Sequence, residues 1–159
     1  MDSAKLNDWL QVIGLFGVIA SLVFVGMQMK QDREIALSDA YQARTATAID
    51  FQASVVSSPE LLDAQLRVQE NGFENVSARD RILYTTYVRM GLNIYENVYF
   101  QYMNGFIDDE HWSRTQNQIR QFLLSPPNRV AIRQDIDAGL WRESFGEYLV
   151  NQLDELGSE

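Results

Sequence analysis

The feature that most limits what this chain can fold into is a long apolar run near its N-terminus. From Trp9 to Met29 the sequence reads WLQVIGLFGVIASLVFVGMQM, and no residue of the run carries a charge. About 20 apolar residues in a helix cross a hydrocarbon core of roughly 30 Å. Trp9 suits the lipid–water interface at one end of the run, and Lys30 closes the other. The run therefore predicts a transmembrane helix over 9–29, preceded by a short polar tail over 1–8.

A cleaved signal peptide is the competing interpretation of the same run. Such peptides have a basic N-terminal region, an apolar stretch of about 7–15 residues and a small-residue cleavage site. Here the region before the run contains Asp2 and Asp8, the apolar stretch is longer, and no A-x-A site is present. These differences favour a retained anchor.

The basic residues around the run predict its orientation. Lys30 and Arg33 follow the run, with Arg44 farther on, whereas Lys5 precedes it in the company of two aspartates. Lys and Arg are in excess on cytoplasmic flanks of membrane helices. The difference is one or two charges, and it predicts that the C-terminal domain lies in the cytoplasm.

Small residues share one face of the predicted transmembrane helix. Gly14, Gly17 and Ser21 recur at spacings of three and four, and Gln28 falls on the same face. In lipid, small side chains let two helices approach closely, and an amide gains most by bonding across helices. We therefore expect a helix–helix contact, in a homo-oligomer or with another membrane protein. The alternative is that glycine is simply common in transmembrane helices.

Nothing interrupts the helix after the run until Ser57-Ser58-Pro59. Residues 30–57 are rich in Ala, Gln and Arg, which favour helix, and carry an apolar stripe at helical spacing. The sequence thus predicts one continuous rod, formed by the transmembrane helix and its continuation over 30–57. A soluble helical domain over 58–159 is expected to pack on this rod.

Residues that begin and end helices recur through the predicted soluble domain, and no alternating segment bounded by hairpin turns appears. The expected fold is therefore all-α, a transmembrane helix continuing as a long rod into a soluble multi-helix bundle. The expected helix starts are at Ser58-Pro59, Ser77 and Asp108-Asp109, and the expected ends are at Asn71-Gly72, Asn104-Gly105, Ser125-Pro126-Pro127 and Ala138-Gly139.

Composition excludes several classes of function. The net charge of −9 argues against a nucleic-acid surface, which needs clustered Lys and Arg. The chain has no cysteine, so it has neither disulfides nor thiolate metal ligands. His111 is the only histidine, and the contiguous acids Asp108, Asp109 and Glu110 before it are what a helix N-terminus favours. We expect no metal and no cofactor.

Glu96 is the charge that most invites a functional interpretation. It lies in the middle of a predicted helix among aromatic residues, where burial is costly without a partner. Arg89 lies two turns earlier on about the same face, and Arg129 follows the Pro-Pro turn. A structural ion pair of Glu96 with one of these arginines is the leading interpretation. A general acid with a raised pKa is the alternative.

Aromatic residues also recur along this predicted helix and into the turn after it. They line either a ligand pocket or, more simply, the core. The residues are Tyr95, Tyr99, Phe100, Tyr102 and Phe106.

Five short elements follow one another along the chain in a fixed order. They are SLVFVGMQMKQD (Ser21 to Asp32), Asn93-x-x-Glu96-x-x-Tyr99, Gly105-Phe-Ile-Asp108-x-x-x-Trp112, Pro126-x-x-Arg129 and Phe145-Gly-Glu-Tyr148. With these elements the chain resembles a large group of uncharacterised bacterial single-pass membrane proteins. It departs from the group's pattern at Ile132, where tryptophan is frequent. The resemblance implies a membrane-anchored helical domain in a bacterial inner membrane and implies no activity.

The expected function is that of an interaction or assembly protein without enzymatic activity. It is held in the lipid bilayer and either self-associates or serves as an accessory subunit of a membrane complex. Two alternatives stay open: a ligand-binding sensor domain with an aromatic pocket, and a membrane-bound enzyme that uses Glu96.

Overall fold

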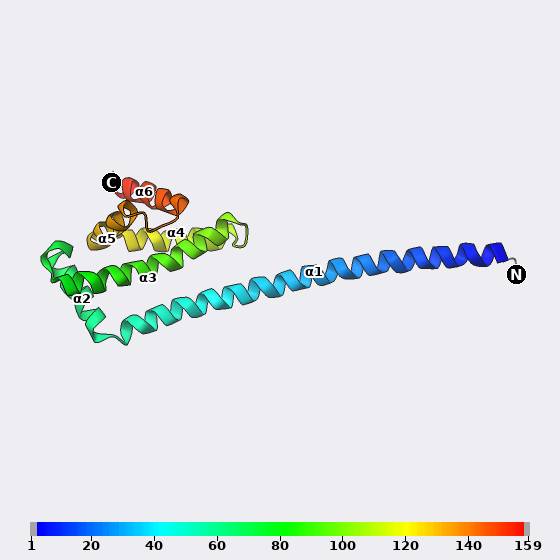
Figure 1. The fold of residues 1–159 in the computed structure, drawn as a ribbon, viewed down its shortest axis with the longest axis horizontal. Helices are drawn as coiled ribbons and strands as arrows, with labels where there is room; N and C mark the ends of the chain where they lie inside the picture. Colours follow the sequence, from blue (N-terminus) through cyan, green and yellow to red (C-terminus); the bar gives the residue numbers. More distant parts are fainter. Residues whose placement is uncertain (1–2, 158–159) are drawn as a thin grey trace. The chain divides into compact units, whose positions relative to one another are not determined.

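The computed structural model describes residues 3–157, with side chains from Asn7 onward. These residues are almost all helical and contain no strand (Figure 1). The predicted all-α fold is thereby confirmed, with a long N-terminal apolar helix leading into a helical domain. The elements in chain order are α1 (Ser3–Val56), α2 (Pro59–Asn71), the short 3-10 helix η1 (Phe73–Asn75), α3 (Ala78–Met103), α4 (Asp109–Leu124), α5 (Pro126–Asp137) and α6 (Glu143–Gly157).

The chain forms two compact units, residues 1–43 and residues 44–159. We call them the N-terminal unit and the helical unit. Helix α1 contributes to both, because its last turns, from Arg44 to Val56, count with the soluble helices. The sequence-based division placed the beginning of the soluble domain at residue 58.

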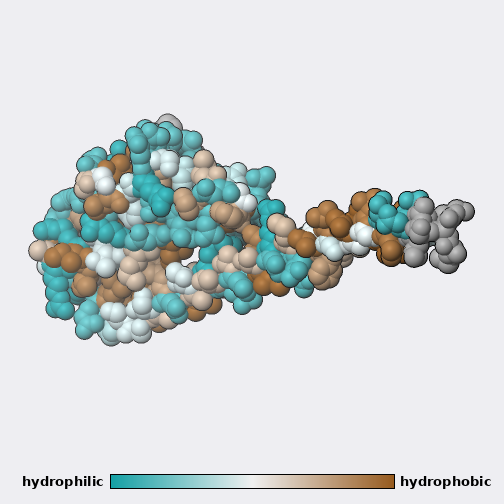
Figure 2. Space-filling model, turned by 45° about the vertical axis from the view of Figure 1, so that its right-hand side comes forward, coloured by the Kyte–Doolittle hydropathy of each residue, from teal (hydrophilic) through white to brown (hydrophobic). Residues whose placement is uncertain are grey.

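The N-terminal unit carries the apolar run with its side chains exposed. Within the described residues, α1 is the one helix long and apolar enough to span a membrane, with a window of mean hydropathy 2.3 that is not buried at all. Phe16 and Phe24 are exposed to 67% and 68%, and Figure 2 shows hydrophobic residues along this part of α1. In water such a surface is unfavourable, since each Å² of exposed apolar area costs roughly 25 cal/mol. This exposure fits a helix whose natural surroundings are lipid.

Capping residues set the helix boundaries in the helical unit as the sequence predicted. The Ser58 side chain accepts a hydrogen bond from the Leu61 N–H at 3.3 Å, and Asp108 accepts one from the His111 N–H at 2.7 Å. Each bond satisfies an N–H that the first turn of a helix leaves open. Gly105, just after α3, has a φ of +73°, a conformation that favours glycine.

The predicted cap of α3 also fastens α2. Ser77 accepts a hydrogen bond from the Asp80 N–H at 3.1 Å, and the Asp80 carboxylate accepts one from Arg67 of α2 at 2.9 Å. That bond from Arg67 is the main reason why the pKa of Asp80 lies below its ordinary value of 3.8. Asp80 thus takes part in the start of its own helix and joins that helix to α2.

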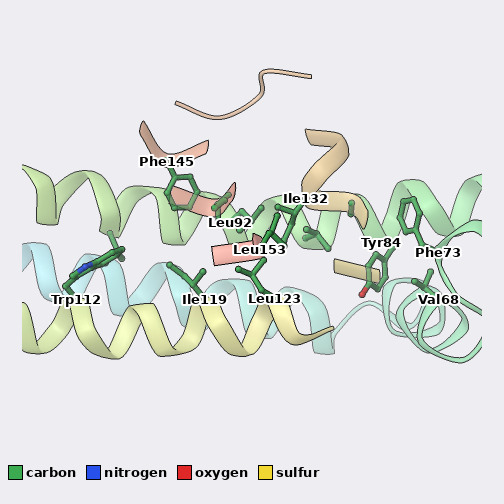
Figure 3. Close-up of a cluster of buried hydrophobic side chains, with 14 of the residues drawn as sticks. Val68, Phe73, Tyr84, Leu92, Trp112, Ile119, Leu123, Ile132, Phe145 and Leu153 are labelled. Carbon is green, nitrogen blue, oxygen red and sulfur yellow. The ribbon is translucent and has the colours of Figure 1, made fainter. Parts of the chain in front are cut away.

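The core of the helical unit gathers around α3, which contacts α2, α4 and α5, while α6 contacts α4 and α5. Figure 3 shows the buried side chains that meet between these helices. Leu92, Ile119, Leu123, Ile132 and Leu149 have no exposed surface. Complete burial of such side chains stabilises a fold by about 1.5–3 kcal/mol each.

One polar network crosses this core. The Tyr84 hydroxyl donates a hydrogen bond to the Asn128 side chain at 2.6 Å, and Asn128 donates one to the Phe122 carbonyl at 2.8 Å. Gln69 of α2 donates to the Tyr84 hydroxyl at 3.1 Å. Burial raises the pKa of Tyr84. Because buried polar groups are costly when unpaired, the network selects one arrangement of α2, α3 and α5.

Side chains from the last turns of α1 contact α3. Phe51 stacks on Tyr87 with ring centroids 5.8 Å apart, and the Arg44 guanidinium donates a hydrogen bond to Gln101. The apolar stripe predicted along residues 30–57 comprised Leu37, Tyr41, Ala48, Phe51 and Val55. Its last three members are half-buried, whereas Leu37 and Tyr41, which belong to the N-terminal unit, are exposed.

Candidate functional site

The predicted membrane-helix face lies open along the N-terminal unit. Gly14, Gly17, Ser21 and Gln28 are all exposed, and a Cβ built on either glycine meets nothing within 4 Å. The Ser21 hydroxyl donates a hydrogen bond to the Gly17 carbonyl of its own helix at 2.8 Å. Because the Ser21 hydroxyl is already hydrogen-bonded within its own helix, it needs no partner from a neighbouring helix. The face therefore offers small side chains against which a second helix can pack.

Gln28 is the polar end of this face. Its carboxamide has no hydrogen-bond partner among the residues that the structure describes. In a low-dielectric medium an unpaired amide costs free energy, and another helix can supply its partner. The face therefore combines close-approach positions with one unpaired polar group.

The structure corrects the expected pairing of Glu96. Glu96 is half-buried, and its carboxylate accepts a hydrogen bond from the backbone N–H of Arg142 at 2.9 Å. This N–H lies just before α6, so Glu96 links α3 to the start of that helix. Neither Arg89 nor Arg129 reaches Glu96 within the described part of the chain. Seven-residue spacing places Arg89 and Glu96 on similar faces of α3. They are nevertheless two turns, or roughly 11 Å, apart along the helix, which is too far for their side chains to pair.

Arg89 instead pairs with Asp135 of α5, which sequence reasoning missed. Its Nε and Nη2 atoms donate to the two carboxylate oxygens at 2.9 and 2.7 Å, a bidentate geometry. The Asp135 side chain is only 2% exposed, and the hydrogen bond to it raises the pKa of Arg89. Asp135 stands three residues after Ile132, on the buried face of its helix. A charge on that face was the signal available in the sequence.

Arg129 pairs with neither Glu96 nor Asp135. It is half-buried in the first turn of α5 and makes no ion pair among the described residues. Its backbone N–H bonds to the Ser125 carbonyl at 3.2 Å, as the start of a helix requires. Ile132, where the resembling group often has tryptophan, is fully buried.

The predicted aromatic run separates into different roles. Tyr99 and Tyr102 pack on Trp112, with ring centroids 5.7 and 5.0 Å away, and so belong to the core. Phe100 and Phe106 are exposed to 41% and 58%. Tyr95 lines a groove in the helical unit. The five residues therefore do not share one environment.

The acidic turn before Trp112 forms local contacts. Asp109 accepts a hydrogen bond from the Tyr102 hydroxyl at 3.1 Å, and Glu110 pairs with Arg114 at 3.2 Å. Burial lowers the pKa of His111, with Arg44 and Arg114 adding to the effect. Among the described residues there is no group of three His, Cys, Asp or Glu side chains that could hold a metal ion.

A groove of about 570 Å³ opens within the helical unit, between the last turns of α1 and helices α3 and α4. Phe51, Ile94, Tyr95 and Phe122 form its apolar walls, and Gly91 of α3 lies among them. Tyr95 meets Phe122 edge-on, with ring centroids 6.0 Å apart. Of this lining, the sequence indicated only Tyr95 as a pocket candidate, because the groove depends on how three separate helices pack.

No protein-family model, curated protein or solved structure matches the chain. The resemblance drawn from the sequence elements stays a prediction.

Proposed function

We propose that this protein is a single-pass membrane protein of the bacterial inner membrane whose helical unit lies in the cytoplasm. It assembles through the face formed by Gly14, Gly17, Ser21 and Gln28. The assembly is a homo-oligomer or an accessory association with another membrane protein. No enzymatic activity is part of the proposal.

The observation that carries the proposal is the state of α1 between Trp9 and Met29. Its side chains are exposed and uncharged over a length that matches a bilayer. Water does not tolerate such a surface, and lipid does. The charge asymmetry between Lys5 on one side and Lys30 with Arg33 on the other supports the cytoplasmic orientation.

The small-residue face supports assembly over a solitary anchor. Two glycines one turn apart, with open space above them, offer a neighbouring backbone a close approach. Gln28 at the end of the same face supplies an amide that a second helix satisfies. The position of Glu96 supports a structural role for that residue, since its bond to the Arg142 N–H fixes the start of α6.

The test is the mass of the full-length protein in a mild detergent, measured by light scattering after size exclusion. We expect more than one chain per micelle, or a stoichiometric co-purifying membrane protein. Replacing both Gly14 and Gly17 with isoleucine is expected to weaken the association at least tenfold, about 1.4 kcal/mol, because branched side chains keep the helices apart.

Gly26→Ile is the matched control. At 3.6 residues per turn Gly26 lies on the opposite face of the helix, and the space around it is equally open. It should leave the association unchanged. A wild-type protein that is monomeric without a partner, or an equal effect of the control, contradicts the proposal.

A further inference from the structure

The groove between α1, α3 and α4 has the dimensions and the lining of a small-molecule site. Its volume of about 570 Å³ lies within the range of about 300–1,000 Å³ that is usual for ligand pockets. All of its lining belongs to the helical unit. The membrane helix and its contact face play no part in it.

Aromatic rings form its apolar surface. The ring centroid of Phe122 lies 6.0 Å from that of Tyr95 and 6.0 Å from that of Tyr87. Phe51 stacks on Tyr87, which supports these rings without lining the groove itself. Burial raises the pKa of Tyr95, which keeps its hydroxyl neutral. Such ring faces favour contact with another flat, apolar surface.

Gly91 holds this space open. It is buried within α3 and its φ is not positive, so no backbone conformation requires glycine there. Glycine inside a helix costs roughly 1 kcal/mol relative to alanine. A Cβ at this position would lie 3.4 Å from Phe122 and 3.8 Å from Phe51, and a longer side chain would fill the space between the two rings.

Four carboxamide side chains also line the groove, together with Ala48. The side chains of Gln52, Asn117, Gln118 and Gln121 are exposed, and none of them has a hydrogen-bond partner in the described part of the chain. Although charged residues make up 22% of the chain, none lines the groove. A carboxamide offers both donors and an acceptor without charge, and so complements a neutral polar edge and not an ion.

We propose that this groove binds an uncharged, planar ring compound that carries carbonyl or amide groups along its edge. The ring lies against Tyr95 and Phe122, and the polar edge meets the carboxamides. A charged ligand would find no counter-charge in the lining of the groove. An aliphatic chain would leave the carboxamides unused.

Binding is tested with the full-length protein in lipid nanodiscs, with lumiflavin, menadione and caffeine as neutral planar probes and empty nanodiscs as the blank. At least one probe should bind saturably by calorimetry. Ala48→Trp fills the groove from α1, because Ala48 lines it, and should weaken that binding at least tenfold. Gly91→Leu should do the same from α3.

Ala46→Trp is the matched control, since Ala46 is exposed and lies on the opposite side of the same helix. It should leave the affinity unchanged, and an unchanged unfolding temperature of Ala48→Trp shows that the loss comes from filling the groove. The proposal is overturned if no probe binds, if Ala46→Trp has the same effect as Ala48→Trp, or if decanol binds in the groove and the planar probes do not.

Discussion

Replacing Arg89 with methionine is expected to lower the free energy of unfolding of the helical unit by about 3 kcal/mol. This is the low end of the cost of leaving one buried charge unpaired, because the Asp135 carboxylate is buried although the Arg89 side chain is 46% exposed. The substitution leaves the Asp135 carboxylate 2% exposed and without its bidentate partner. Methionine keeps the length and apolar stem of arginine, so packing between α3 and α5 changes little. Thermal unfolding of the full-length protein in mild detergent, followed by near-UV circular dichroism, measures the effect.

Arg133→Met is the control for this prediction. Arg133 also lies on α5, and its pair with Asp154 is 3.5 Å long with side chains 57% and 65% exposed. Exposed pairs contribute about 0–1 kcal/mol, so this variant should unfold close to the wild type. Adding Asp135→Leu to Arg89→Met should recover much of the loss, because no buried charge then remains unpaired. If Arg89→Met costs no more than Arg133→Met, the structural importance assigned to the Arg89–Asp135 pair is wrong.

Two arginines in the middle of the apolar run are expected to abolish stable membrane anchoring. Val18→Arg together with Leu22→Arg places two charges where each costs about 2.5–3.5 kcal/mol in an inserted helix. Both positions are exposed on α1 and lie near the middle of the apolar run. After an alkaline carbonate wash, the wild-type protein should stay in the membrane pellet and the double variant should appear in the supernatant.

Ile49→Arg with Val56→Arg is the matched pair in the helical unit. These side chains are also exposed on α1, to 57% and 72%, but they lie outside the predicted span. This variant should stay in the pellet. Release of both double variants would show that added charge alone frees the protein from membranes, and retention of both would show that residues 9–29 are not the anchor.

Helix boundaries in this protein were predictable because the interactions that set them are local. Ser58 and Asp108 each bond to an N–H three residues ahead, and Gly105 comes directly after Asn104, the C-cap residue of α3. Such contacts can be recognised without knowing where any other helix lies. Helix η1, over Phe73–Asn75, was not foreseen, because a single short turn carries no periodicity.

Partners between helices were not predictable in the same way. Asp135 pairs with Arg89, which is 46 residues earlier in the sequence, and Glu96 accepts a hydrogen bond from the Arg142 N–H, which is 46 residues later. Periodicity shows which face of a helix is buried, but it does not show how two packed helices are shifted along their axes relative to each other. Residues on a common face, such as Arg89 and Glu96, therefore found different partners. The groove beside Gly91 needs three helices in place and lay beyond sequence reasoning for the same reason.

The central claim is that residues 9–29 cross the bilayer and that the chain leaves it on the cytoplasmic side at Lys30. The absence of native cysteine makes a direct test simple, because single cysteines can be introduced one at a time and labelled without background. The measurement is reaction with a membrane-impermeant maleimide in inside-out and right-side-out vesicles. We expect no reaction at positions 12 to 26 in either preparation, and reaction at position 49 in inside-out vesicles alone. Equal labelling at positions 18 and 49 would contradict the membrane span, and labelling at position 49 in right-side-out vesicles would contradict its orientation.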